Sequence, residues 1–155
     1  MACSENVKEL STLSTNELSI TIPDGQSREY SYTDKNGGFY YGMTSTDDWG
    51  DWYAGWNIYA KRIFADYRLY VDGERLLREN ARTSVYPDKL VRSYEEAVET
   101  FCLVDEPKLL CVRMDSVQGK QISFMLMGEN VVDARKDGNS VLYTTKESPE
   151  NVIRI

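Results

Sequence analysis

The residues best suited to chemistry lie in one short window, between residues 47 and 57. All three tryptophans of the chain are there, together with a tyrosine, two glycines and three aspartates. The aromatic and acidic members of the window are Asp47, Asp48, Trp49, Asp51, Trp52, Tyr53 and Trp56. Large ring faces beside carboxylates make either a cluster of core packing or a surface that stacks on flat, polar ligands such as sugars. The function of the chain depends on which of the two it is.

The three aspartates are the candidates for catalysis in this window. An acid and a base acting on a glycosidic bond need carboxyl groups roughly 5 to 10 Å apart, and the spacing of Asp47, Asp48 and Asp51 does not decide this. Aspartates in a glycine-rich loop more often form turns by bonding their own backbone. The aspartate spacing of an EF-hand is absent, although other calcium geometries stay open. We therefore expect no catalytic residue, no metal and no cofactor in this chain.

The composition excludes several classes of function. The chain has no histidine, which removes Ser/His and Cys/His nucleophile pairs and histidine-containing metal sites. The formal net charge is −7 and the basic residues are scattered, so we expect no nucleic-acid partner. No apolar run approaches the roughly 20 residues of a membrane-spanning helix. We expect the chain to contact a membrane only if a lipid is attached to Cys3.

The amino end differs in composition from the rest of the chain. Residues 5–17 are rich in Ser, Thr, Asn and Glu, which predicts a flexible tether over residues 1–17. Ala2-Cys3-Ser4 before such a tether resembles the cleavage region of a bacterial lipoprotein signal, with Cys3 as the lipidated residue. This reading predicts a periplasmic or outer-membrane-anchored lipoprotein. The alternative is an ordinary cytoplasmic start with an incidental cysteine.

From residue 18 onward the pattern has a period of two, with turn residues at short intervals. It predicts an all-β chain in one domain over residues 18–155, with little or no helix. About ten or more short strands cannot stay in one open sheet, so we expect a two-layer antiparallel β-sandwich, supersandwich-like in form. The expected strands are 18–22, 28–33, 39–41, 57–64, 66–71, 74–77, 83–86, 89–94, 97–104, 108–114, 120–127, 131–134 and 141–145. Turn residues at 34–38 and 72–73 predict hairpins there.

Two cysteines are expected to face each other across a hairpin. If Glu106 and Pro107 form its tip, Cys102 lies opposite Cys111. A non-hydrogen-bonded antiparallel pair has a Cα separation of about 4.5 Å, near the lower end of the disulfide range. A bridge would require an oxidising compartment. The alternative, which we favour because cross-strand bridges are strained, is two reduced thiols packed as small apolar residues.

The aromatic residues divide into core and surface candidates. Trp56 begins an expected strand and is expected to pack in the core, whereas Trp49 and Trp52, in the Asp/Gly loop, either pack in the core or face solvent or another domain. Tyrosines are also concentrated in the first half of the chain, where many must be core or cross-strand pairs. They are Tyr30, Tyr32, Tyr40, Tyr41, Tyr53, Tyr59, Tyr67 and Tyr70.

Four segments together resemble a known family. Residues 34–42 (DKNGGFYYG) look like the Asn-Gly-Gly-aromatic entry of the amino-terminal sandwich domain in glycogen-debranching, amylo-α-1,6-glucosidase-like enzymes. Residues 60–73, 85–94 and 98–113 are similar to later strands of that domain, as found in glycosidases with a six-hairpin helical barrel. The resemblance covers roughly residues 20–145 and consists of strand and turn patterns rather than catalytic signatures.

The resemblance implies that the sandwich and the catalytic residues belong to different domains. In such enzymes an (α/α) barrel after the sandwich supplies both catalytic carboxylates, and the sandwich packs on it and sometimes lends loop residues to the cleft. No catalytic residue is carried over, and the implied partners are carbohydrate or a C-terminal helical catalytic domain. The resemblance also implies that the sandwich domain is truncated at its C-terminus and that the tryptophan window is an interdomain or cleft-edge loop.

Three functions follow as hypotheses. The leading one is a non-catalytic N-terminal sandwich domain of a glycoside hydrolase acting on α-glucans or related oligosaccharides. The second is a free-standing carbohydrate-binding lipoprotein. The third is a structural or interaction β-sandwich without a ligand.

Overall fold

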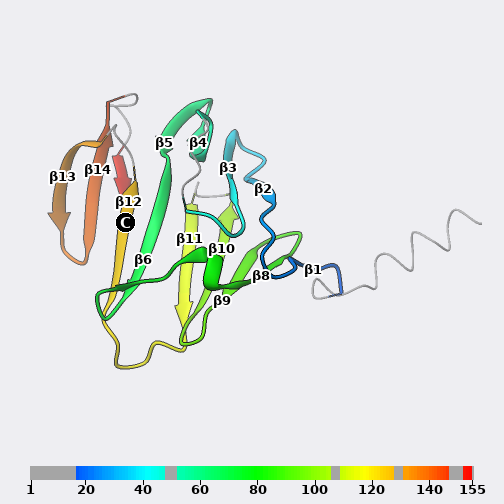
Figure 1. The fold of residues 1–155 in the computed structure, drawn as a ribbon. Helices are drawn as coiled ribbons and strands as arrows, with labels where there is room; N and C mark the ends of the chain where they lie inside the picture. The colour runs from blue at the N-terminus through cyan, green and yellow to red at the C-terminus, as the bar shows by residue number, and fades with distance from the viewer. Residues whose placement is uncertain (1–16, 48–51, 106–108, 128–130, 147–151, 155) are drawn as a thin grey trace, which may run out of the picture.

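The computed structural model describes residues 17–47, 52–105, 109–127, 131–146 and 152–154. Within these ranges the chain is almost entirely antiparallel sheet (Figure 1). The predicted all-β sandwich is confirmed. One short 3-10 helix, η1 at Arg78–Asn80, interrupts the strands, and no helix in the described ranges is long and apolar enough to span a membrane.

The first layer starts with a four-stranded meander. Its strands follow in sequence order as β2 (Glu29–Thr33), β3 (Gly38–Met43), β4 (Gly55–Ile58) and β5 (Lys61–Phe64). After a bend at Ala65 the chain enters β6.

The strand after that bend belongs to a second, three-stranded sheet. Its order is β12 (Ile122–Met127), β6 (Asp66–Val71) and β7 (Glu74–Arg75). The amide of Ala65 donates to the carbonyl of Met127, so hydrogen bonding to β12 continues through the bend. Figure 1 shows β5 running on into β6, which makes the two sheets one curved layer.

The second layer is a five-stranded sheet. Its order is β1 (Ile20–Thr21), β8 (Arg82–Val85), β9 (Leu90–Ser93), β10 (Val98–Val104) and β11 (Leu109–Asp115).

A last meander stands at the edge of the molecule on the side of β12 (Figure 1). It consists of β13 (Val131–Asp137), β14 (Ser140–Thr145) and β15 (Val152–Arg154).

An aromatic core joins the two layers. Its centre is Phe101 of β10, whose ring lies 4.7 Å from that of Tyr40 on β3 and is stacked at 8° on that of Tyr67 on β6, with centroids 6.2 Å apart. The buried cluster comprises Tyr30, Tyr40, Trp56, Ile63, Phe64, Tyr67, Leu69, Leu90 and Phe101. Because these residues come from strands of both layers, burying them holds the layers face to face.

Most of the expected hairpins are present. The turns at 34–38 and 72–73 join β2 to β3 and β6 to β7 as predicted. The register of β10 on β11 sets Cys102 opposite Cys111, which confirms that pairing. Both cysteines are half-buried free thiols in this structure, and burial, with the neighbouring Cys111, raises the pKa of the Cys102 thiol.

Several strand predictions are wrong in their bounds. The expected strand 57–64 is two strands, because Tyr59 and Ala60 adopt positive φ of 50° and 61° and turn the chain between β4 and β5. Such a turn usually contains Gly, Asn or Asp, so these two residues gave no signal. The expected strand 18–22 is reduced to Ile20–Thr21.

Gly55 marks the tightest backbone approach in the first layer. Its φ is +91°, and a Cβ there would overlap the carbonyl oxygens of Phe64 and Ala65. Gly73, in the β6–β7 turn, has almost the same φ of +88° but nothing within 4 Å of the added carbon. Both positions need glycine for a positive φ, but only Gly55 also needs it because there is no room for a Cβ atom.

We expect Gly55→Ala to destabilise the fold by more than about 3 kcal/mol, since a carbon overlapping backbone forces the sheet apart. The matched Gly73→Ala change should cost only about 1 to 2 kcal/mol, the strain of a positive φ in an alanine. Urea unfolding of both variants measures the difference. Equal losses would show that β4 and β5 do not approach as closely as described.

Candidate binding surface

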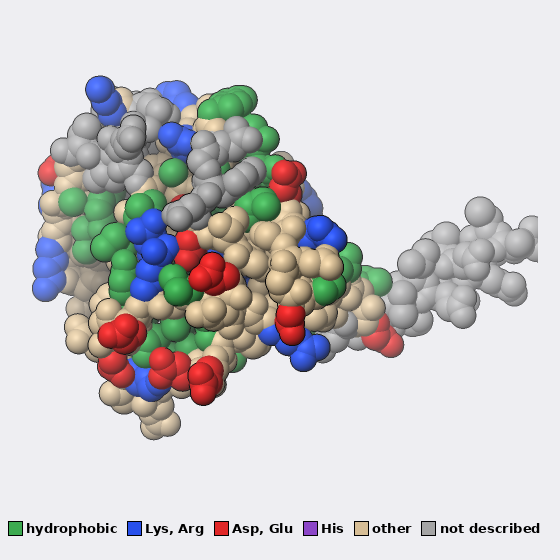
Figure 2. Space-filling model, in the orientation of Figure 1, with side chains coloured by type: hydrophobic (Ala, Val, Ile, Leu, Met, Phe, Trp, Pro, Cys, Tyr) green, Lys and Arg blue, Asp and Glu red, His purple; other side chains and the backbone are tan. Residues whose placement is uncertain are grey.

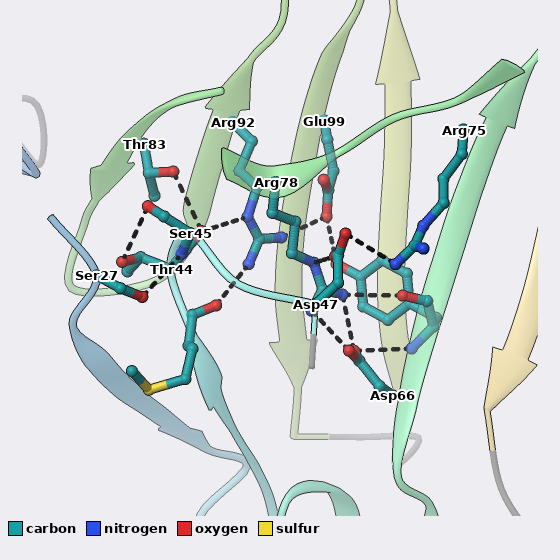
Figure 3. Close-up of polar contacts among 12 residues, drawn as sticks. Ser27, Thr44, Ser45, Asp47, Asp66, Arg75, Arg78, Thr83, Arg92 and Glu99 are labelled. Carbon is teal, nitrogen blue, oxygen red and sulfur yellow. Dashed lines mark hydrogen bonds and ion pairs between the residues drawn. The ribbon is translucent and has the colours of Figure 1, made fainter. Parts of the chain in front are cut away.

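The tryptophan window is held at its first end by a carboxylate. Asp47 binds two arginines, Arg75 of β7 at 2.9 Å and Arg78 of η1 at 3.4 Å, and its side chain is only 12% exposed (Figure 3). The two ion pairs connect the segment after β3 to β7 and to η1. Asp47 is thus an anchor for the chain entering the window.

Arg78 continues this contact into the interior. Its guanidinium makes a bidentate pair with Asp66, with both hydrogen bonds 2.7 Å long, and donates to the Tyr67 carbonyl at 2.9 Å. It also lies over the Tyr67 ring, 4.9 Å from the centroid. Asp66 in turn accepts a 2.8 Å hydrogen bond from the Tyr40 hydroxyl. Planar, bidentate pairing of this kind is the strongest geometry for an arginine and a carboxylate.

A second, fully buried ion pair lies deeper between the layers. Arg92 of β9 and Glu99 of β10 face each other in the sheet register, 2.8 Å apart and both 0% exposed. The other nitrogens of Arg92 donate to the carbonyls of Met43 and Thr44 at the end of β3 (Figure 3). The pair therefore ties the second layer to the segment that leads into the window.

Tyrosine hydroxyls complete this buried network. Tyr67 and Tyr94 donate to the two oxygens of Glu99, and Tyr30 accepts a hydrogen bond from Arg92. Burial is the main reason why the pKa values of Tyr30, Tyr40, Tyr67 and Tyr94 lie above the ordinary 10.0. The negative charge of Glu99 raises those of Tyr67 and Tyr94 further.

The window is held at its second end by side chains of the neighbouring strands. Arg62 of β5 donates to the Trp52 carbonyl at 3.1 Å, and Asn57 of β4 donates to the Tyr53 carbonyl at 2.9 Å. Asn57 and Arg62 are cross-strand partners, so they share one face of the sheet. That face is the outer one, because Trp56, the neighbour of Asn57, points into the core. Trp52 and Tyr53 consequently lie over the outer face of the first layer.

Three aromatic rings form a continuous chain on this outer face. Trp52 meets Tyr53 edge to face, with centroids 5.2 Å apart at 87°, and Tyr53 meets Tyr41 of β3 at 4.7 Å and 52°. Trp52 is 79% exposed, while Tyr53 and Tyr41 are half-buried. We call the rings of Trp52, Tyr53 and Tyr41 the aromatic surface.

Polar groups border the aromatic surface. The strand alternation places Glu29 and Ser31 of β2 on the same face as Tyr41, beside Arg62 and Asn57 on the other side. Burial, and after it hydrogen bonds to Glu29 and Tyr53, raises the pKa of the Tyr41 hydroxyl above its ordinary value. Ring faces bordered by carboxylate, hydroxyl and guanidinium groups are suited to a ligand that is both flat and rich in hydroxyls.

The hollows in the described part of the chain do not offer a more enclosed site. The cavity beneath Tyr41, between Tyr40, Asp66 and Arg78, has about 10 Å³, room for one water. A wide, open depression of about 750 Å³ lies by the β2–β3 turn, where Lys35 and Asp105 pair across it. None of its described lining residues is aromatic.

The structure places the predicted site residues in different environments. Trp52 is largely exposed and Tyr53 is half-buried. The expectation of core packing for Trp56 is confirmed, since the residue is 7% exposed and its ring centroid lies 5.8 Å from that of Phe64. Trp56, which the sequence also offered for ligand or interdomain contact, therefore presents no exposed ring face. Asp48, Trp49, Asp51 and Cys3 lie outside the described residues.

The carboxylate-pair hypothesis loses one member. Asp47 is bound to Arg75 and Arg78, which gives it a structural role at the start of the window. Among the described residues there is no group of three or more Cys, Asp or Glu side chains placed to hold a metal ion. No protein-family model, curated protein or solved structure matches this chain.

Sequence reasoning missed several residues that build the surface. Phe39, Tyr40 and Tyr41 are all aromatic, so their alternation gave no sign that Tyr41 faces out and Tyr40 faces in. Arg62 and Glu29 gave no signal, because their roles depend on cross-strand partners.

We expect Glu99→Gln to lower the free energy of unfolding by about 3 to 5 kcal/mol, since it leaves the charge of Arg92 buried and uncompensated. The control is Glu96→Gln, which removes a surface pair with Lys120 and should cost less than about 1 kcal/mol. Thermal or urea unfolding of the two variants makes the comparison. Similar small losses in both would contradict a buried ionic centre.

We also expect the fold to lose stability above pH 10. The buried tyrosines have pKa values raised above 10.0, so the folded state keeps protons that the unfolded chain releases. Their contribution is complete below pH 10 and is lost as the pH rises through the higher folded values. Tyrosinate absorbance followed together with circular dichroism should show these groups ionising only as the sheet unfolds. Ionisation of all eleven tyrosines with the sheet intact would contradict this.

Proposed function

We propose that this chain binds carbohydrate through the aromatic surface and acts as a non-catalytic sandwich domain of a carbohydrate-active enzyme. The observation that carries the proposal is the exposed Trp52 ring, set on Tyr53 and Tyr41 at the outer face of the first layer. Sugars present apolar C–H faces that stack on such rings and hydroxyls that hydrogen-bond to polar side chains beside them.

The way the window is held supports a binding role. Arg62 and Asn57 fix the backbone of Trp52 and Tyr53, and Asp47 fixes the entry of the window to Arg75 and Arg78. A surface held in place before the ligand arrives loses less conformational entropy on binding. The exposed position of Trp52 on a fixed backbone is therefore better explained by ligand binding than by a ring that does not fit into the core.

The charge around the surface favours a neutral ligand. The chain carries a net charge of −7, and basic and acidic side chains are spread over the face shown in Figure 2 rather than gathered into one basic patch. Phosphate-bearing ligands need such a patch. The resemblance of residues 34–42 and the later segments to debranching-enzyme sandwich domains adds α-glucans as the expected class of carbohydrate, with the hydrolytic carboxylates on another domain.

Titration with maltoheptaose, a soluble α-glucan oligosaccharide, tests the proposal. We expect saturable heat in calorimetry and a change in tryptophan fluorescence as Trp52 is covered. Trp52→Ala should weaken binding at least about tenfold, because it removes the exposed ring face.

The control for that titration is Met125→Ala on β12, which truncates another exposed apolar side chain in a different sheet and should leave the affinity unchanged. Absence of binding to maltoheptaose and to a panel of other soluble oligosaccharides would refute carbohydrate recognition. Equal weakening by both variants would place the site elsewhere.

A further inference from the structure

Cys102 and Cys111 lie opposite each other on the outer face of the second layer. They are cross-strand partners in β10 and β11, and the residues on either side of Cys102, Phe101 and Leu103, pack in or against the core cluster. Because side chains alternate between the two faces of a sheet, both thiols point away from the core. Each is half-buried. Burial, and after it the Cys111 thiol to which it is hydrogen-bonded, raises the pKa of Cys102.

The hydrogen-bond pattern of the sheet decides which kind of cross-strand pair the cysteines form. The amide of Tyr94 donates to the carbonyl of Ala97 at the β9–β10 turn, so the backbone groups of Ala97 face β9. Successive residues of a strand turn these groups to opposite neighbours, which directs those of Cys102 towards β11. Cys102 and Cys111 are therefore a hydrogen-bonded pair, in which the Cα atoms lie about 5.5 Å apart. That is a common Cα separation in disulfides.

A disulfide at this position would nevertheless be easy to reduce. The Cβ atoms of a directly opposite, hydrogen-bonded pair lie about 5.5 Å apart, whereas those of a disulfide lie about 3.8 Å apart. Closing the bond has to draw the two strands together against their own hydrogen bonds, and such strain makes a disulfide more reducible. The Cα separation permits the bond while the Cβ separation strains it, which suits a bond that opens and closes rather than a permanent one.

The bond would hold an edge strand in place. β11 is the last strand of the five-stranded sheet, and within the described residues β10 is its only paired neighbour. Its inward side chains, Leu110, Val112 and Met114, pack against the core cluster. A strand that is paired on one side opens more easily than one that is paired on both. A covalent link to β10 within β11 would keep these apolar side chains over the core.

We propose that Cys102 and Cys111 are a reversible thiol–disulfide pair, which a low-molecular-weight disulfide such as glutathione disulfide oxidises so that β11 becomes covalently linked to β10. The structure, with both thiols free, is the reduced form. This inference is independent of the proposed function, because the aromatic surface lies on the other layer of the sandwich.

The reaction is a thiol–disulfide exchange in two steps. The thiolate of Cys111, on the edge strand, attacks one sulfur of glutathione disulfide, which forms a mixed disulfide and releases one glutathione thiolate. The thiolate of Cys102 then attacks the Cys111 sulfur and releases the second glutathione thiolate. Each released thiolate takes up the proton that a cysteine has lost. The protein is oxidised by two electrons, and glutathione disulfide is reduced to two thiols.

Equilibration of the intact chain in glutathione buffers of increasing oxidised fraction, followed by acid quenching and alkylation of free thiols, tests the proposal. We expect the two thiols to disappear together, with the mass of the chain falling by two hydrogen atoms, and excess reduced glutathione to restore both. Tryptic cleavage of the oxidised chain should give residues 93–108 joined to residues 109–113. The same result is expected for Cys3→Ser, which removes the third cysteine of the chain.

A serine variant separates this pair from an ordinary reactive thiol. Cys102→Ser should stop at a mixed disulfide on Cys111, with the mass of one glutathionyl group added and no joined peptides. In reducing buffer it should keep an unfolding midpoint close to that of the parent, because the side chain is only half-buried and lies on the outer face.

Three results would overturn the proposal. The first is that both thiols stay free, or that the parent chain stops at the mixed disulfide, in the most oxidising buffer. The second is a joined pair that excess reduced glutathione does not open, because that would be a permanent bridge. The third is a bond from either cysteine to Cys3 in place of the bond between them.

Discussion

The buried ion pair between Arg92 and Glu99 connects more of this structure than any other described contact. The two residues are cross-strand partners in the second layer, yet Arg92 binds carbonyls at the end of β3 and Glu99 accepts a hydrogen bond from Tyr67 of β6. Charges removed from water are costly unless every oxygen and nitrogen finds a partner. The geometry of β3, β6, β9 and β10 is therefore constrained by the need to satisfy this pair.

A second set of contacts, made by Arg78, connects this buried network to the surface. Tyr40 donates to Asp66, Asp66 pairs with Arg78, and Arg78 also binds Asp47 at the entrance of the window. The chain is therefore held to the core before the window by Asp47 and its arginine contacts. After the window it is held by Gly55 and Trp56, which are buried beside β5. Between these fixed points Trp52 and Tyr53 are carried onto the outer face. A largely exposed indole is stable in this position because its backbone is bonded on both sides of the peptide.

The different positions of the two described tryptophans follow from this arrangement. Trp56 is the first residue after the tight approach of Gly55, so the alternation of β4 sends its ring inward against Phe64. Trp52 precedes that approach and has no such restriction. The window contributes one tryptophan to the core and one to the surface, and the surface one shares its face with Tyr41 of a neighbouring strand. A buried ring and a solvent-exposed ring, which the sequence presents as alternatives, both occur within the same window.

The amino-acid sequence was sufficient to predict the all-β class, the hairpins at 34–38 and 72–73, the register of Cys102 on Cys111 and the core position of Trp56. These follow from period-two patterning and from turn residues, which act over a few positions of the chain. The turn at Tyr59 and Ala60, the outward position of Tyr41 and the pairing of Asp47 with Arg75 and Arg78 could be seen only in the folded chain. Those outcomes depend on partners distant in sequence, and a run such as Phe39-Tyr40-Tyr41 is compatible with either face until a second layer buries one of them.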